Sequence, residues 1–245
     1  MKLVAALLCS TVLLIAGASL AEPPSDNDPF AVRVEGYLGA VVADVDNYGD
    51  ESAFEGGGMG SAVALFGPAF FQLDVYGDYM DFDEDLSTVG LGGYLGLVGA
   101  EVGSVALTGG WERALGSTDV DLGRVGAEGE LYLGAFTLGA AADYLRIADT
   151  HADGWDAYGL VRFYPTENLK LEGVGGYADL GPDGVPQGGL LVEYRPEGFW
   201  LSFFARWVGR FDIGDSGDLH SAVAGVRFYW DRGLSLRETD RVYFR

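Results

Sequence analysis

The residue types that most often perform catalysis are scarce in this chain, which has two histidines and one cysteine among 245 residues. His151 and His220 lie near aspartates in the sequence, and Ser216 and Ser221 flank His220. A serine, a histidine and an aspartate in contact with one another could catalyse hydrolysis by nucleophilic attack. Polar loops commonly contain residues of these types, so we predict that the chain is not an enzyme.

Clusters of acidic residues suggest a second kind of chemistry, the binding of divalent cations. Asp44, Asp46, Asp50 and Glu51 form one cluster, and residues 81–85 form another. Their carboxylates are the hard oxygen ligands that Ca²⁺ and Mg²⁺ prefer. Neither cluster has the spacing of an EF-hand loop, and we favour the interpretation of an acidic, solvated rim that repels anions. We therefore predict no cofactor, with Ca²⁺ or Mg²⁺ at these acidic segments as the alternative.

The overall charge and composition exclude two classes of protein. The chain has 37 Asp and Glu residues against 15 Lys and Arg, which gives a formal net charge of −22. Such a chain repels a phosphate backbone, so nucleic-acid binding is excluded. Hydrophobic residues make up 49% of the sequence, which excludes intrinsic disorder. The 39 glycines, 13 tyrosines and 14 phenylalanines favour many strands joined by tight turns.

Residues 1–21 have the organisation of a signal peptide. A basic residue precedes an apolar segment, residues 3–15, that is too short to span a bilayer as a helix. Small residues follow at the positions that a signal peptidase requires, so the mature chain is predicted to begin at Glu22. Cleavage removes Cys9, and the mature protein then contains neither a disulfide nor a thiolate metal site. Residues 22–30 are predicted to form a polar, proline-rich linker.

Between residues 31 and 230, apolar residues alternate with polar or small ones in segments about ten residues long, the length of a membrane-crossing strand. In one such segment, Phe71, Leu73 and Val75 share one face. All eight prolines lie outside the segments, as expected because proline lacks the N–H group that a strand ladder needs. The twelve predicted strands are residues 31–44, 58–66, 70–80, 89–99, 102–113, 124–134, 136–147, 157–164, 169–178, 189–195, 199–211 and 221–230.

The predicted connections alternate between short turns and longer loops. Turn residues occur near 67–69, 134–135, 165–168 and 196–198. Short turns at one end and longer loops at the other are typical of transmembrane barrels with periplasmic turns and extracellular loops. The longer loops contain 18 of the 37 acidic residues and no Lys or Arg, and they are residues 45–57, 81–88, 114–123, 148–156, 179–188 and 212–220.

A water-soluble β-sandwich or lipocalin-like barrel would also show alternation, so the position of the basic residues decides between them. In a membrane barrel an Arg at the lipid midplane costs about 2–4 kcal/mol, and basic residues should therefore avoid the apolar face. Eight of the ten Lys and Arg residues between positions 22 and 230 share the phase of the polar face, and Arg113 and Arg146 lie at strand ends. We therefore predict an all-β fold, a transmembrane antiparallel up-and-down β-barrel of about 12 strands over residues 31–230.

The signal peptide, the twelve segments and the last of them, Ala222–Trp230, resemble the outer-membrane β-barrel proteins of Gram-negative bacteria, most of all the small porin-type barrels. The resemblance implies export to the outer membrane, where the barrel meets lipid and lipopolysaccharide. It also implies that the barrel-assembly machinery recognises the aromatic residue that ends the last strand, here Trp230. Residues 231–245 follow that strand, and within them residues 242–244 offer a rival ending. We interpret residues 231–245 as a periplasmic tail, because both ends of an even-stranded barrel lie on one side.

The inward-facing charges are predicted to divide into two opposed walls of the lumen. Such walls would create an electric field across the lumen. In the alternative arrangement the charges pair across a narrow barrel and plug it, because unpaired charge is costly in a confined space of low dielectric constant. The acidic wall consists of Asp74, Asp78, Glu112, Glu128, Glu130 and Asp143. The basic wall consists of Arg33, Arg162, Lys170, Arg195, Arg206, Arg210 and Arg227.

The charged lumen and the resemblance together predict a porin-like channel for passive diffusion of small hydrophilic solutes, with selectivity set by the opposed walls. Eight strands enclose a space that side chains fill, and sixteen or more leave an aqueous channel, so twelve is an intermediate size. Inward-facing glycines favour an open lumen. The alternative function is a closed structural or surface-binding barrel whose acidic extracellular loops bind a partner. If the channel prediction holds, replacing Arg206 and Arg227 by alanine shifts ion selectivity toward cations.

Overall fold

The computed structural model describes residues 30–45, 49–81, 85–99, 101–116, 119–148, 152–179, 184–211, 217–230 and 235–241. The predicted signal peptide lies outside the described residues, as does the linker except for its last residue. No helix in the described ranges is long and apolar enough to span a membrane.

Twelve strands and one short helix make up the described part of the chain. The elements are β1 (Phe30–Val45), β2 (Gly49–Phe66), β3 (Ala69–Asp81), β4 (Leu86–Gly99), β5 (Gly103–Leu115), β6 (Val120–Leu133), β7 (Phe136–Ile147), β8 (Asp153–Thr166), β9 (Leu169–Asp179), β10 (Val185–Tyr194), β11 (Leu201–Arg210), β12 (Asp218–Trp230) and α2 (Leu236–Asp240).

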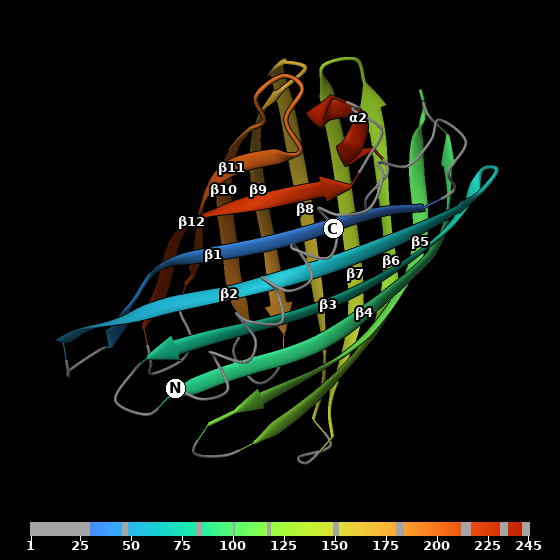
Figure 1. Cartoon of the computed structure of the whole chain (residues 1–245). Helices are drawn as coiled ribbons and strands as arrows, with labels where there is room; N and C mark the ends of the chain where they lie inside the picture. Colours follow the sequence, from blue (N-terminus) through green and yellow to red (C-terminus); the bar gives the residue numbers. More distant parts are fainter. Residues whose placement is uncertain are drawn as a thin grey trace.

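The strands form a closed barrel in which each strand pairs antiparallel with its neighbours in the sequence (Figure 1). The barrel closes between β1 and β12, whose register runs from Val32 opposite Trp230 to Asp44 opposite Asp218. This closure leaves no edge strand with unpaired backbone groups, which is the condition for a sheet to cross a bilayer. The predicted transmembrane antiparallel up-and-down barrel of twelve strands is confirmed.

Several strands are longer than predicted, and the connections between them are correspondingly shorter. The largest difference is in β2, which begins at Gly49 although residues 45–57 are predicted as a loop. This segment is rich in glycine and shows little alternation, yet it pairs with β1 as far as Gly49 opposite Val45. The ladder of backbone hydrogen bonds therefore extends the strand where the side-chain pattern gives no signal.

Two prolines lie within strands, contrary to the prediction that all eight lie outside them. Pro165 is next to the last residue of β8, where the pairing with β9 is irregular between Phe163 and Thr166. Pro186 is the second residue of β10. Both are positions at a strand end or irregularity, where the missing N–H group of proline interrupts the ladder least.

The alternation of the strands places apolar side chains outside the barrel and polar side chains inside it. The outward-facing Leu95, Leu107 and Leu131 are each more than half exposed, whereas the inward-facing Glu35 and Glu193 are almost completely buried. A water-soluble protein has the opposite distribution, with charged residues exposed and apolar residues buried. This distribution is that of a transmembrane barrel and excludes the water-soluble alternative.

Leu107→Arg should destabilise the barrel by about 2–4 kcal/mol, because Leu107 lies near the middle of β5 and faces lipid. Val102→Arg should cost only about 0–1 kcal/mol, because Val102 lies in the turn that precedes the same strand. Urea unfolding of both variants in lipid vesicles measures the two free energies. Equal costs at the two positions would contradict the assignment of Leu107 to the membrane core.

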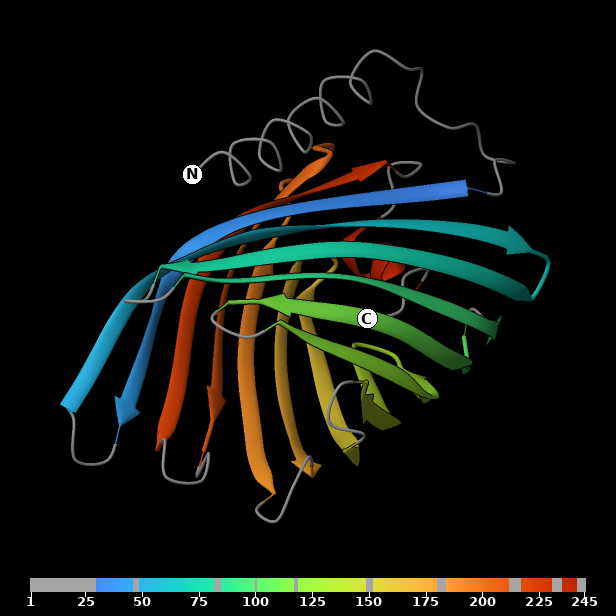
Figure 2. The ribbon, with the colours of Figure 1, turned by 90° about the horizontal axis from the view of Figure 1, so that it is seen from below.

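Part of the C-terminal tail packs inside one end of the barrel. We call this end the turn end, and it carries the connections around residues 67–68, 101–102, 134–135, 167–168 and 195–200. Residues 231–245 are predicted as a tail beyond the last strand, whereas α2 lies within the ring of strands (Figure 2). Leu236 explains the difference, because this apolar residue is completely buried against inward-facing side chains of the strands, including Phe70 and Tyr94.

A capping box defines the start of α2. The Ser235 hydroxyl accepts a hydrogen bond from the backbone N–H of Glu238, and the Glu238 carboxylate accepts one from the backbone of Ser235. Hydrogen bonds from the backbone and the hydroxyl of Ser235 lower the pKa of Glu238 below its usual value. The carboxylate is therefore ionised, as the capping box requires, at neutral pH.

Candidate functional site

Side chains at the turn end hold α2 inside the barrel. The ammonium group of Lys170 on β9 lies 2.8 Å from the carboxylate of Asp240. The hydroxyl of Tyr164 on β8 donates a hydrogen bond to the same carboxylate at 2.9 Å. Arg195, directly after β10, donates to the hydroxyl of Thr239 at 3.1 Å. Residues on β8 and β9 and directly after β10 thus bind α2 through buried polar contacts, and α2 narrows the mouth of the lumen at this end.

The inward charges next to α2 form one network of buried ion pairs, which we call the ion-pair cluster. In each case a buried cation contacts two carboxylates. Arg162, for example, lies 2.7 Å from Glu130 and 2.7 Å from Glu172. The members of the cluster are Glu35, Glu130, Arg162, Lys170, Glu172, Glu193, Arg227 and Asp240.

The register of the strands creates several of these pairs. Arg162 lies directly opposite Glu172 across β8 and β9. Arg227 lies opposite Glu35 across β12 and β1, and their charged groups are 2.6 Å apart. Opposite charges at facing positions of neighbouring strands attract. Three residues of the basic wall are therefore paired with acids, and among these acids only Glu130 comes from the predicted acidic wall.

Three further residues of the predicted basic wall lie outside the ion-pair cluster. Arg33 donates a hydrogen bond to the hydroxyl of Ser61 at 3.2 Å. The guanidinium of Arg206 is 3.7 Å from the carboxylate of Glu35 and is partly exposed to the lumen. Arg210 is exposed at the end of β11 that is far from α2. Arg206 and Arg210 are therefore more exposed than the arginines of the ion-pair cluster.

The residues of the predicted acidic wall are distributed differently. Glu130 joins the ion-pair cluster, Asp78 lines a cavity, and the other four accept hydrogen bonds from neutral groups. The donors are Gln72 to Asp74 at 2.9 Å, Tyr76 to Glu112 at 2.9 Å, Tyr158 to Glu128 at 3.3 Å and Thr108 to Asp143 at 2.6 Å.

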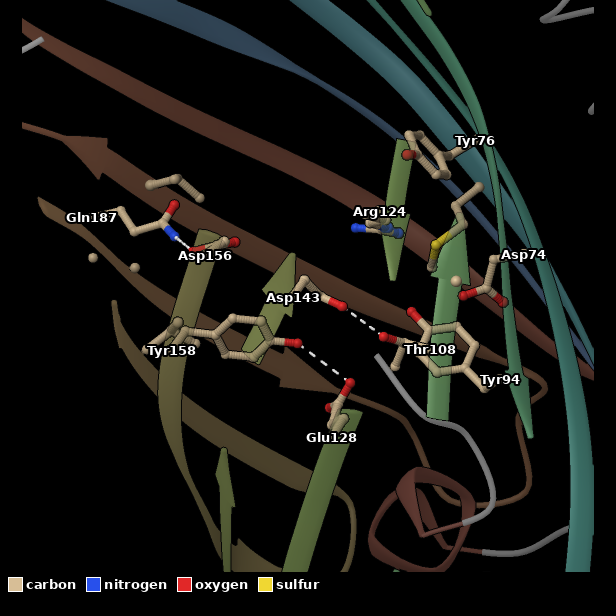
Figure 3. Close-up of a pocket in the computed structure, with 16 residues that line it drawn as sticks. Asp74, Tyr76, Tyr94, Thr108, Arg124, Glu128, Asp143, Asp156, Tyr158 and Gln187 are labelled. Atoms are coloured by element: carbon tan, nitrogen blue, oxygen red, sulfur yellow. Dashed lines mark hydrogen bonds between the residues drawn. The ribbon is translucent and has the colours of Figure 1, made fainter. Parts of the chain in front are cut away.

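Two adjacent cavities in the lumen are lined by residues that the structure describes. The larger, with a volume of about 330 Å³, is lined by acidic, tyrosine and glutamine side chains together with Arg124 (Figure 3). The smaller, with a volume of about 250 Å³, reaches the ion-pair cluster and Asp240 of α2. Met59 and Tyr76 line both cavities, so the two spaces are adjacent.

Inward-facing glycines do not leave the open space that the sequence suggests. A Cβ atom at Gly96 would lie 2.7 Å from the ring of Phe70, and one at Gly176 would lie 2.8 Å from the Cβ atom of Tyr158. The side chain of Asp143 likewise lies over Gly126. These glycines make room for large or charged side chains of neighbouring strands, which narrow the lumen.

Sequence reasoning missed several residues of the lumen. Asp156 and Gln187 line the larger cavity, although both fall in segments predicted as loops. Leu236 and Asp240 belong to the predicted tail. The spacing of Ser235 and Glu238 is a capping-box pattern and was the available signal for the helix.

The serine, histidine and aspartate combination is not assembled in the described part of the chain. His220 faces outward, where its ring stacks on Trp207 with centroids 5.8 Å apart. Its neighbour Ser221 faces inward and donates a hydrogen bond to Glu55. Adjacent residues of a strand point to opposite faces, which separates the two. His151 and Ser216 lie outside the described residues.

The described residues contain no group of three His, Cys, Asp or Glu side chains arranged to hold a metal ion. The acidic segments that are the alternative prediction for a Ca²⁺ or Mg²⁺ site lie partly outside these residues. This applies to Asp46 and residues 82–84, and to the side chains of Asp44, Asp50 and Glu51.

The closed twelve-stranded barrel with an apolar outer surface and a polar interior has the fold of outer-membrane β-barrel proteins. No protein-family model and no curated protein sequence matches the chain. Among solved structures, the NanC porin is similar with a TM-score of 0.58 and 9% identity, over 80% of this chain and 98% of that chain.

Two further structures show that this fold serves more than one role. An outer-membrane channel from Pseudomonas putida F1 has a TM-score of 0.57 and 9% identity, over 85% of this chain and 97% of that chain. The translocator domain of the autotransporter NalP from Neisseria meningitidis has a TM-score of 0.55 and 12% identity, over 90% of this chain and 96% of that chain. These similarities establish the fold.

Proposed function

We propose that the chain is an outer-membrane channel through which small hydrophilic solutes diffuse passively, and that the charges of its lumen set its selectivity. The observation that carries the proposal is the pair of adjacent cavities inside the barrel, each lined in part by charged side chains, with volumes of about 330 and 250 Å³. The similarity to two solved channel barrels supports it. In this proposal the turn end faces the periplasm, and export uses the signal peptide of residues 1–21 and the barrel-assembly machinery.

The larger cavity should favour cations. Four carboxylates line it, and Arg124 is the only Lys or Arg among its lining residues. A lumen lined mainly by one sign of charge concentrates ions of the opposite sign. The opposed-wall arrangement is therefore replaced in this proposal by an acidic cavity next to an ion-pair cluster in which three cations pair with five carboxylates.

Replacing both Asp143 and Asp156 by asparagine should lower the permeability ratio of K⁺ to Cl⁻ by about twofold or more, because it removes two of the four negative charges of the cavity. Reversal potentials across a planar bilayer with a salt gradient measure this ratio. Asp153→Asn is the matched control, since Asp153 is exposed and lies outside the cavity. An equal ratio in the double variant and the control would contradict the lumenal role of the two aspartates.

A closed structural or surface-binding barrel is the second candidate function, and the ion-pair cluster and α2 favour it. In that case the acidic loops would bind the partner. Conductance separates the two functions, because a closed barrel passes no ions whether or not α2 occupies its mouth. Removal of the loops would then abolish binding of the partner without any change in conductance.

A further inference from the structure

A second set of charged side chains lines the larger cavity, separate from the ion-pair cluster. Arg124 on β6, Asp143 on β7 and Asp156 on β8 come from three consecutive strands. Figure 3 shows all three at the cavity, together with Tyr158 and Gln187. The cavity thus presents both signs of charge within one space.

Two glycines position the guanidinium of Arg124 against the wall of the barrel. A Cβ atom at Gly110 on β5 would lie 2.8 Å from its Nε atom, and one at Gly92 on β4 would lie 3.4 Å from its Nη2 atom. The side chain therefore extends from β6 across two neighbouring strands. Among the described residues it forms no ion pair and no hydrogen bond, in contrast to Arg162, which contacts two carboxylates. Its N–H donors are available to a solute.

The two aspartates are also available for an ion pair. Asp143 and Asp156 lie directly opposite each other across β7 and β8. Each uses one oxygen to accept a hydrogen bond from a neutral group, from Thr108 at 2.6 Å and from Gln187 at 2.7 Å. No described Lys or Arg lies within ion-pair distance of either one. Like charges at facing positions destabilise a sheet, so a cationic group between them would be favourable.

We propose that this cavity binds a small zwitterionic solute, with its carboxylate at Arg124 and its ammonium group at Asp143 and Asp156. The planar guanidinium group suits a carboxylate because it donates two parallel hydrogen bonds. A solute with only one charged group would form an ion pair with Arg124 or with the aspartates, and not with both. The volume of about 330 Å³ is in the range of small-molecule sites. The inference rests on the proposed channel function and specifies the class of solute.

Binding to the refolded mature protein in detergent micelles tests the inference without any need for conduction. Saturation-transfer NMR detects weak binding, and a channel site must be weak enough to release its solute. The probes are L-alanine, propionate, which lacks the ammonium group, ethylammonium, which lacks the carboxylate, and D-xylose, an uncharged polyol. We expect L-alanine to bind at least about tenfold more tightly than each of the other three, because it alone satisfies both charges.

Arg124→Ala should weaken L-alanine binding by at least about tenfold, because it removes charge-assisted hydrogen bonds to the carboxylate. Arg124→Lys keeps the charge and should show an intermediate loss, which separates recognition from a folding defect. Arg113→Ala is the matched control, since Arg113 is paired with the exposed Asp119 and lies outside the cavity. Heat-modifiable gel mobility verifies that each variant forms a barrel.

Three results would overturn the inference. Equal binding of ethylammonium and L-alanine would define a simple cation site, and preferential binding of D-xylose would define a polyol site. L-alanine binding that survives Arg124→Ala unchanged would place the solute elsewhere. Because the assay does not depend on conduction, binding in a protein that fails to conduct would refute the channel and leave the site intact.

Discussion

The Leu236→Glu variant should conduct ions in single-channel steps at least about twofold larger than those of the unmodified protein, because the mouth that α2 narrows becomes wider. Leu236 is completely buried in the cluster that joins α2 to the barrel wall. An unpaired carboxylate at this position costs several kcal/mol. A helix as short as α2 depends on such contacts for its position, so the substitution should release it from the turn end.

Arg237→Gln provides the control on the same helix. Arg237 is paired with Glu167 at 2.6 Å, and Glu167 is half exposed. An exposed pair of this kind contributes about 0–1 kcal/mol, so α2 should stay in place and the conductance should not change. Planar-bilayer recordings of both variants, refolded under the same conditions, make the comparison. Steps of the same size in Leu236→Glu and the unmodified protein would show that α2 does not limit the passage of ions.

Arg227→Ala should destabilise the barrel by about 3–5 kcal/mol, because it leaves buried carboxylates without their cation. The Arg227 guanidinium lies 2.6 Å from Glu35 and also contacts Glu193, and both acids are almost completely buried. Arg227 is thus a structural residue, and its replacement reports on stability more than on selectivity. Urea unfolding in lipid vesicles, followed by heat-modifiable mobility, measures the loss.

Arg206→Ala is the matched control for this loss. Arg206 approaches Glu35 only to 3.7 Å and is partly exposed to the lumen. Its removal should cost about 1 kcal/mol or less, while the selectivity of the channel moves toward cations. A similar destabilisation by the two substitutions would contradict the distinct roles of these arginines.

The strands were predictable from the sequence because lipid and lumen impose opposite requirements on alternate residues. In β5, for instance, the outward Leu107 and the inward Thr108 follow this alternation. The first half of β2, residues 49–57, was not predicted as a strand because its glycines carry no side-chain signal. Its backbone nevertheless pairs with β1.

The arrangement of the lumen was less predictable, since it depends on register and on contacts distant in the sequence. Alternation places Arg162 inside the barrel, and only the register brings it opposite Glu172. The position of α2 depends on Asp240 meeting Lys170, which is 70 residues earlier in the chain. The spacing of Ser235 and Glu238 in the sequence identifies the capping box of α2. This spacing does not indicate where in the barrel the helix packs.

Single-channel conductance of the refolded mature protein in a planar bilayer tests the channel assignment most directly. We expect discrete steps that increase with salt concentration, with K⁺ more permeant than Cl⁻. A protein with the heat-modifiable mobility of a folded barrel that produces no steps, both with α2 intact and in the Leu236→Glu variant, would contradict it. The acidic loops would then be the functional surface.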